Sequence, residues 1–242
     1  MGESLNWSKR LDMIEGIAQG LVYLHDLSSH QCVVHMDLKA NNILLDYEMN
    51  PKISDFGMAR ILPSSGTEET SDTVKGTTGY MDPEYIRSGK FSAKSDVYSF
   101  GIMILEIVSR KKCLSLLSNG DMMDLLTRMS TNLLPFAKIA WELWKAGKPH
   151  ELADVSSPSN DQQTAQIIRC IHVALLCIQD CPMHRPTMLD VLLMLRSESF
   201  ASLPTPSVPV NHTDEHQAEA LTLEGFWEVN VPLQPVEEMV TS

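Results

Sequence analysis

The stretch 33-VVHMDLKANNILLD-46 constrains the fold of this chain more than any other. Two short apolar runs, 32-CVV-34 and 42-NILL-45, flank its polar residues, a pattern typical of short strands that frame a loop. The tripeptide 55-DFG-57 begins nine residues after Asp46. The sequence therefore predicts a polar loop framed by two strands.

The rest of the chain is expected to be mainly helical. Apolar residues at helical spacing predict an amphipathic helix over residues 9–25, and a strongly apolar stretch predicts a buried central helix over 93–109. Residues 61–79, rich in Ser, Thr and Gly, are expected to form a long surface loop. Further helices are expected at 132–147, 162–179 and 186–196.

Composition narrows the possible functions. The chain has 242 residues and a net charge of -12, so it is not expected to bind nucleic acid or an anionic membrane surface by electrostatics. The longest apolar run, 97–108, contains Glu106 and is too short to predict a membrane span. The five cysteines include no CxxC pair, which favours a reducing compartment.

The chain changes character after Arg196. No Lys or Arg follows, five prolines appear, and acidic residues dominate the charge. Such a segment is typical of disorder. We therefore expect a globular domain over residues 1–200 and a disordered acidic tail over 201–242.

Four polar residues, in or shortly after the stretch 33–46, have the side chains that phosphoryl transfer needs. Asp37 provides a carboxylate to orient a hydroxyl, Asn42 and Asp55 provide oxygen ligands for Mg²⁺, and Lys39 provides positive charge. The alternative interpretation is that these residues only form turns, because Asp and Asn do so readily. The combination of these residues in this order, at close spacing and followed by 76-GTTGYMDPE-84, favours the catalytic interpretation.

These motifs resemble the eukaryotic protein kinase family and, within it, plant receptor-like kinases of the S-domain or cysteine-rich type. The resemblance covers residues from about 5 to 200. The segments that carry it are 15-EGIAQGLVYLH-25, 35-HMDLKANNILLD-46, 51-PKISDFGMARI-61, 94-KSDVYSFGIMILEI-107 and 169-RCIHVALLCIQDCPMHRPTM-188.

The resemblance implies a Ser/Thr protein kinase that uses ATP and Mg²⁺. Asp37 would be the catalytic base, and Lys39 would bind the transferred phosphoryl group and indicates Ser/Thr specificity. Asn42 and Asp55 would hold the metal. The implied fold is the C-terminal lobe of the kinase domain, mainly α, with short strands around the catalytic loop.

The resemblance also implies supporting contacts. His35 and Phe56 would stack, and Asp96 would anchor the backbone of the catalytic loop. Thr77 would touch Asp37 and Lys39. One buried ion pair is expected to tie the activation segment to a late helix, between Glu84 and Arg185.

Two positions depart from the family pattern. Met36 stands where Arg usually binds a phosphate on the activation loop, so phosphorylation at Thr70, Ser71 or Thr73 is not expected to order the loop through that position. Asp82 replaces the usual small residue before Pro-Glu, and this change is expected to matter little.

The part of a kinase that covers the nucleotide has no match here. Residues 1–34 contain no G-x-G-x-x-G, and Lys9 does not lie in an apolar strand. Three hypotheses follow: a kinase of weak or no activity alone, a non-catalytic interaction module (a pseudokinase or decoy), or a partial gene product. The expected partners are protein substrates or other receptor-like kinases. The chain is expected in the cytoplasm, where such partners could hold it at the inner face of the plasma membrane.

Overall fold

The structure, a computed structural model, describes residues 5–26, 31–63, 68–112, 135–153, 160–197 and 203–207. Helices dominate these residues, and six short strands form three two-stranded antiparallel sheets. All described residues belong to one compact unit, Met1–His212. The mainly helical prediction agrees with this composition.

Helix α3 (Ala93–Ser109) forms the centre of the core. Fourteen of its 17 residues are buried, which suits a helix that is apolar on nearly all sides. A capping box between Ser92 and Ser95 starts it. A Cβ added at Gly101 would lie 2.7 Å from Cβ of Cys177, so glycine allows the close approach of α6 (Asp161–Cys177).

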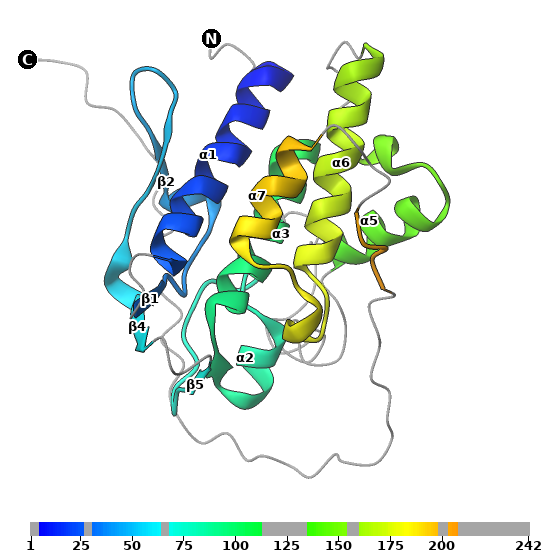
Figure 1. Ribbon diagram of the computed structural model, residues 1–242. Helices are drawn as coiled ribbons and strands as arrows, with labels where there is room; N and C mark the ends of the chain where they lie inside the picture. The colour runs from blue at the N-terminus through cyan, green and yellow to red at the C-terminus, as the bar shows by residue number, and fades with distance from the viewer. Residues whose placement is uncertain are drawn as a thin grey trace, which may run out of the picture. The chain divides into compact units, whose positions relative to one another are not determined.

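Four helices pack around this core (Figure 1). Helix α1 (Trp7–His25) contacts both α3 and α7 (Met188–Arg196), and α6 contacts α3, α7 and α5 (Pro135–Lys145). The apolar stripe of α1 supplies Ile14, Ala18 and Leu21 to the core, as its periodicity predicted. Short 3₁₀ turns lie at Ala40–Asn42, Phe56–Met58, Pro149–Leu152 and Pro182–His184.

Two of the small sheets frame the predicted loop. Strand β1 (Gln31–Val34) pairs with β4 (Arg60–Pro63), and β2 (Ile43–Leu45) pairs with β3 (Pro51–Ile53). The two strands predicted on either side of the loop are confirmed, although each pairs with a later strand. This pairing places residues 35–42 beside the segment that follows β3.

The prediction of an uninterrupted loop over residues 61–79 is wrong in two places. Strand β4 continues to Pro63, and β5 (Glu69–Thr70) pairs with β6 (Lys90–Phe91), which follows helix α2 (Pro83–Ser88). A two-residue strand whose partner lies twenty residues away leaves no periodic signal in the sequence.

The predicted helices are confirmed, with shifts of a few residues at their ends. The prediction over 132–147 corresponds to α5, which ends at Lys145; Gly147 follows with a φ of 72°. That left-handed conformation suits glycine and stops the helix. Residues 132–134 lie outside the described residues.

Part of the predicted tail packs on the domain. The carbonyl oxygen of Pro204 lies 2.7 Å from Nε2 of His172, and burial lowers the pKa of this histidine. Gln179 accepts from the Ser207 amide at 3.2 Å and donates to its carbonyl at 3.3 Å. Residues 203–207 therefore contact the helices of the domain, and residues 208–242 lie outside the described residues.

Candidate active site

A buried aspartate fixes the backbone of the predicted catalytic loop. Asp96, in the first turn of α3, accepts hydrogen bonds from the His35 amide at 2.7 Å and the Met36 amide at 3.0 Å. Its side chain is 1% exposed, and Nε2 of His25 lies 3.0 Å from the same carboxylate. Bonds to a buried charge are stronger than neutral ones, so this contact determines where the loop lies. The contacts expected between Asp96 and the backbone of this loop are therefore present.

Asp37 lies at the centre of a cluster of hydrogen bonds. Its Oδ1 accepts from the Thr77 hydroxyl at 2.6 Å and the Thr77 amide at 3.1 Å. Its Oδ2 accepts from Nζ of Lys39 at 2.7 Å, and Lys39 also donates to the Thr77 hydroxyl at 2.8 Å. The predicted contacts of Thr77 are confirmed. The Asp37 side chain is 9% exposed, so its carboxylate has a defined orientation and limited access to solvent.

Asn42 joins this cluster to the segment that follows β3. Its Nδ2 donates to the Asp37 carbonyl at 2.9 Å and to Oδ2 at 3.3 Å. Its own carbonyl accepts from the amide and the hydroxyl of Ser54, both at 2.9 Å. Because Nδ2 faces Asp37, the amide oxygen of Asn42 faces away from it and can serve as a ligand.

His35 also connects the predicted catalytic loop to the segment that follows β3. His35 lies in contact with Phe56, with ring centroids 5.0 Å apart, as predicted. Nε2 of His35 donates to the Ser54 carbonyl at 2.9 Å, and Nδ1 accepts from the Asp37 amide at 3.3 Å, which fixes the tautomer of the ring. Asp55 is exposed and has a φ of 64°, an uncommon conformation for a residue other than glycine.

The side chains of Asn42 and Asp55 offer oxygen ligands of the kind that a magnesium ion prefers. Among the described residues, no group of three or more His, Cys, Asp or Glu side chains could hold a metal ion. Mg²⁺ does not require such a group, because it binds to one or two protein oxygens and completes its shell with water and phosphate. The Asn42 amide oxygen and the Asp55 carboxylate therefore fit Mg²⁺ and do not fit a structural zinc.

Met36 has an apolar role in place of the usual charged one. It has a φ of 69° and packs against a small buried cluster of Val34, Leu62, Tyr85 and Phe91. Val74 of the activation segment packs against the same cluster. Because the loop and the segment share these contacts, they are tied together without any phosphate.

Polar contacts hold the same segment in place. The Tyr85 hydroxyl accepts from the Lys75 amide at 3.1 Å and donates to the Thr73 carbonyl at 3.3 Å. The Ser71 amide donates to the Gly89 carbonyl at 2.9 Å, and the Ser71 hydroxyl donates to the Thr73 carbonyl at 2.8 Å. Thr70 and Thr73 are exposed and Ser71 is half-buried, so the two threonines are accessible to a modifying enzyme.

The expected ion pair between Glu84 and Arg185 is wrong. Arg185 pairs with Asp82 through two bonds of 2.7 and 2.8 Å, and these side chains are 0% and 2% exposed. Glu84 lies at the surface, 3.4 Å from Arg87. Asp82 precedes the first turn of α2 and caps it through the Glu84 amide at 2.9 Å, which points its carboxylate inward. Asp82 is therefore structurally important, contrary to the expectation.

Arg185 is satisfied on every edge of its guanidinium. It donates to the carbonyls of Gln179 at 2.7 Å, Asp180 at 3.0 Å and Lys94 at 3.1 Å. Its charge also lies 5.0 Å from the centre of the Tyr98 ring. A buried arginine with this many partners joins the activation segment to α3 and to the turn before α7.

Two residues that the sequence did not predict to contribute to the site do so. His25 ends a predicted helix, and no role was expected for it, although it contacts Asp96. Asp82 was expected to matter little, although it pairs with Arg185.

Cys32, three residues before His35, has a pKa raised to about 11, chiefly by burial and then by Asp96, so its thiol stays protonated at neutral pH.

Comparison with known proteins agrees with this geometry. Residues 4–194 match the family model described as "Protein kinase domain". Two cysteine-rich receptor-like protein kinases of Arabidopsis thaliana, numbers 10 and 20 (the second named putative), are 45% and 48% identical over 85% and 90% of this chain. A putative G-type lectin S-receptor-like serine/threonine-protein kinase of the same plant is 48% identical over 87% of it.

The chain spans less than a third of the length of these relatives: 29%, 31% and 23%. No helix among the described residues is both long enough and apolar enough to cross a bilayer. The family match covers most of the chain and contains the Asp37 cluster, Asp96 and Arg185. The chain therefore belongs to the protein kinase domain family and is similar to plant receptor-like serine/threonine kinases.

Proposed function

We propose that this chain carries the catalytic half of a Ser/Thr protein kinase site, which transfers the γ-phosphoryl group of ATP to a protein hydroxyl. One observation carries the proposal: Asp37, Lys39 and Thr77 contact one another at 2.6 to 2.8 Å. A carboxylate beside a lysine and a hydroxyl-bearing residue is what positions a serine or threonine for phosphoryl transfer.

In this mechanism, Asp37 orients the substrate hydroxyl and accepts its proton. The substrate oxygen forms a bond to the γ-phosphorus as the bond between that phosphorus and the β–γ bridging oxygen breaks, giving a phosphoester and ADP. Lys39, at 2.7 Å from Asp37, places positive charge where negative charge develops. Thr77 keeps the carboxylate in one orientation before the substrate arrives.

Asn42 and Asp55 would hold Mg²⁺ on the phosphates. The bound ion would neutralise charge on the β- and γ-phosphate oxygens. Asn42 presents its amide oxygen because its Nδ2 donates to Asp37. Asp55 is exposed at the start of a 3₁₀ turn, where its carboxylate is accessible.

We propose further that the described residues correspond to the C-terminal lobe. Large apolar side chains on the strands and the turn around the site are exposed, and a second lobe would cover them: Leu44 is 56% exposed, Phe56 45% and Ile61 62%. No G-x-G-x-x-G precedes the catalytic loop in this sequence. Phosphoryl transfer by the chain alone should therefore be weak, and a nucleotide-covering lobe should raise it.

The same exposed side chains support a second candidate function. Exposed apolar side chains that lie close together commonly mark a surface for protein contact. A chain that binds a kinase or a kinase substrate through these side chains, without catalysis, would be a pseudokinase or decoy. Under either function the partners are proteins. The chain would act in the cytoplasm, where these partners could hold it at the inner face of the plasma membrane.

Phosphate incorporation by the purified chain tests the catalytic proposal. Radiolabelled ATP with Mg²⁺ and casein should give slow labelling on Ser and Thr that Asp37→Asn abolishes. Asp72→Asn is the matched control, because Asp72 is an exposed acid elsewhere on the activation segment. Labelling that is absent, or equal in the chain and in Asp37→Asn, would contradict the catalytic role and favour the interaction module.

A further inference from the structure

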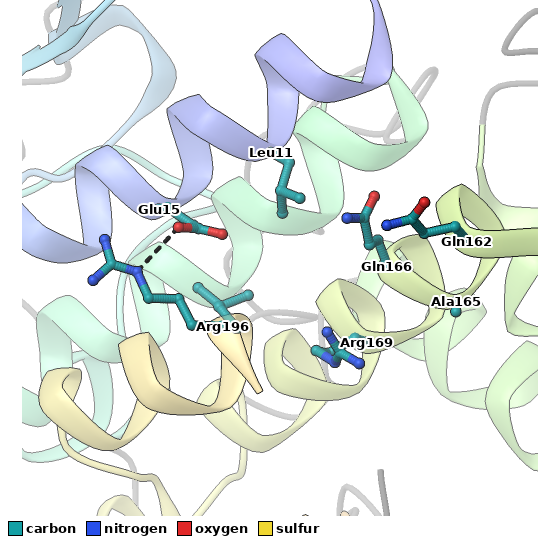
Figure 2. Close-up of a pocket in the computed structure, with 8 residues that line it drawn as sticks. Leu11, Glu15, Gln162, Ala165, Gln166, Arg169 and Arg196 are labelled. Carbon is teal, nitrogen blue, oxygen red and sulfur yellow. Dashed lines mark hydrogen bonds and ion pairs between the residues drawn. The ribbon is translucent and has the colours of Figure 1, made fainter. Parts of the chain in front are cut away.

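A cleft of about 490 Å³ lies between α1, α6 and α7 (Figure 2). It is lined by Leu11, Glu15, Gln162, Ala165, Gln166, Arg169, Leu195 and Arg196. None of the residues proposed to act in phosphoryl transfer lines it. Its size lies within the range of sites that bind small organic molecules.

The residues that line this cleft include more arginine than glutamate. Its lining carries two arginines and one glutamate, a formal charge of +1 by that count, whereas the whole chain carries -12. Arg169 is only 8% exposed, so its positive charge is in a region of low dielectric. A local excess of positive charge on an acidic protein favours an anionic ligand.

One glutamine has a defined orientation that adds a donor. Oε1 of Gln166 accepts from Nε1 of Trp7 at 2.9 Å. Because the indole nitrogen can only donate, this bond identifies the oxygen end of the amide and leaves the NH₂ end as a donor. Figure 2 shows Gln162 and Gln166 above Arg169 and across the cleft from Glu15 and Arg196.

The single carboxylate in the cleft already has a partner. Nε of Arg196 donates to Oε2 of Glu15 at 3.1 Å. Among the described residues, the two terminal nitrogens of Arg196 make no hydrogen bond, and the Arg196 side chain is half exposed. The NH₂ group of Gln166 and the terminal nitrogens of Arg196 are therefore donors that suit the oxygens of a phosphate or carboxylate.

The walls also carry apolar surface. Leu11, Ala165 and Leu195 come from the three helices that form the cleft. A bare inorganic ion would leave this surface in water, whereas an attached organic group would cover it. We propose that the cleft binds a small organic anion, with its phosphate or carboxylate group on Gln166 and the arginines and its apolar part on these walls.

Binding can be measured on the whole chain by following backbone amides by NMR during titration. Phenyl phosphate, benzoate and inorganic phosphate are three separate probes, which distinguish a phosphate from a carboxylate and test the apolar part. Phenyl phosphate or benzoate should shift amides of α1, α6 and α7 and reach saturation. Inorganic phosphate should bind more weakly than phenyl phosphate.

Gln166→Glu is the decisive variant. Its carboxylate keeps an acceptor for Trp7 but replaces the donor NH₂ by a negative charge, so affinity should fall by about tenfold or more. Gln163→Glu makes the same charge change on α6 outside the cleft and should bind as the unchanged chain does. The melting temperature of each variant identifies any loss of fold.

Filling the cleft gives an independent variant. Ala165→Phe leaves every charge in place and should remove binding by occupying the space next to Gln166. Three results would overturn the proposal: no saturable shift with any probe, equal affinity in Gln166→Glu and the unchanged chain, or inorganic phosphate binding as tightly as phenyl phosphate. None depends on kinase activity, so the proposal stands or falls independently of the proposed function.

Discussion

Asp96 and Asp82 are both buried aspartates near the start of a helix, but they hold the site in different ways. Asp96 binds the backbone amides of His35 and Met36, whereas Asp82 binds the guanidinium of Arg185. Recognition of a backbone does not depend on which side chain the loop carries, so the catalytic loop tolerates Met36. Recognition of a side chain depends on both partners, so the activation segment depends on Arg185.

Breaking the pair on the activation segment should have the largest effect. Arg185→Met leaves the Asp82 carboxylate buried without its cation and should lower the free energy of unfolding by about 3–5 kcal/mol. Glu84→Gln is the matched control: its surface pair with Arg87 should be worth about 1 kcal/mol or less. Urea unfolding measures the free energy of unfolding of both variants. A larger loss of stability in Glu84→Gln than in Arg185→Met would favour the expected pair of Glu84 with Arg185 instead.

Changing the catalytic-loop anchor should have a smaller effect. In Asp96→Asn an amide nitrogen replaces one of two acceptor oxygens, so a backbone amide loses its partner, at a cost of about 1.5–3 kcal/mol. Hydrogen exchange should quicken at the amides of His35 and Met36 before it changes elsewhere. If those two amides exchange at the original rate, Asp96 does not fix the loop.

A charge at position 36 separates backbone from side-chain effects. Met36→Arg should leave both backbone bonds to Asp96 in place but put a cation against the apolar cluster with Val74, at a cost of about 1 kcal/mol. Exchange should quicken in residues 71–77 and not at His35. Met36→Leu, which preserves volume and polarity, is the control, and an equal effect of the two substitutions would show that the charge is irrelevant.

Asp46, whose side chain is partly exposed, gives the smallest effect and completes the comparison. Backbone hydrogen bonding from Asn50 leads the causes that lower the pKa of Asp46 from 3.8 to about 2. Because the pKa is lower in the folded chain, Asp46 contributes stability that is present above pH 3.8 and is lost as the pH falls towards 2. Asp46→Asn should flatten the pH dependence of stability in that window. An identical pH profile for the variant would contradict the assignment.

The helices were predictable because each carries a repeating signal. The apolar stripe of α1 and the apolar run of α3 gave element type and approximate bounds directly. Strand β5 was missed because two residues carry no periodicity, and its stability comes from pairing with β6. The docking of Pro204 and Ser207 was missed because it depends on single partners, His172 and Gln179, on a distant helix.

The candidate site was predictable where residue identity alone limits the geometry. Asp37, Lys39 and Thr77 met as expected because the motif order and the resemblance placed them together. The choice between Asp82 and Glu84 for Arg185 was not predictable in that way, since the two acids are two residues apart. Their side chains differ in direction, and only the start of α2 determines which one points inward.

Calorimetry of Mg²⁺-dependent ATP binding, comparing the purified chain with Asp55→Asn, tests the central claim most directly. The account predicts that the chain binds ATP only when Mg²⁺ is present and that Asp55→Asn loses this binding while keeping its melting temperature. Absence of binding in the unchanged chain, or equal binding by a folded Asp55→Asn variant, would contradict the claim that Asn42 and Asp55 form the metal-holding half of a kinase site.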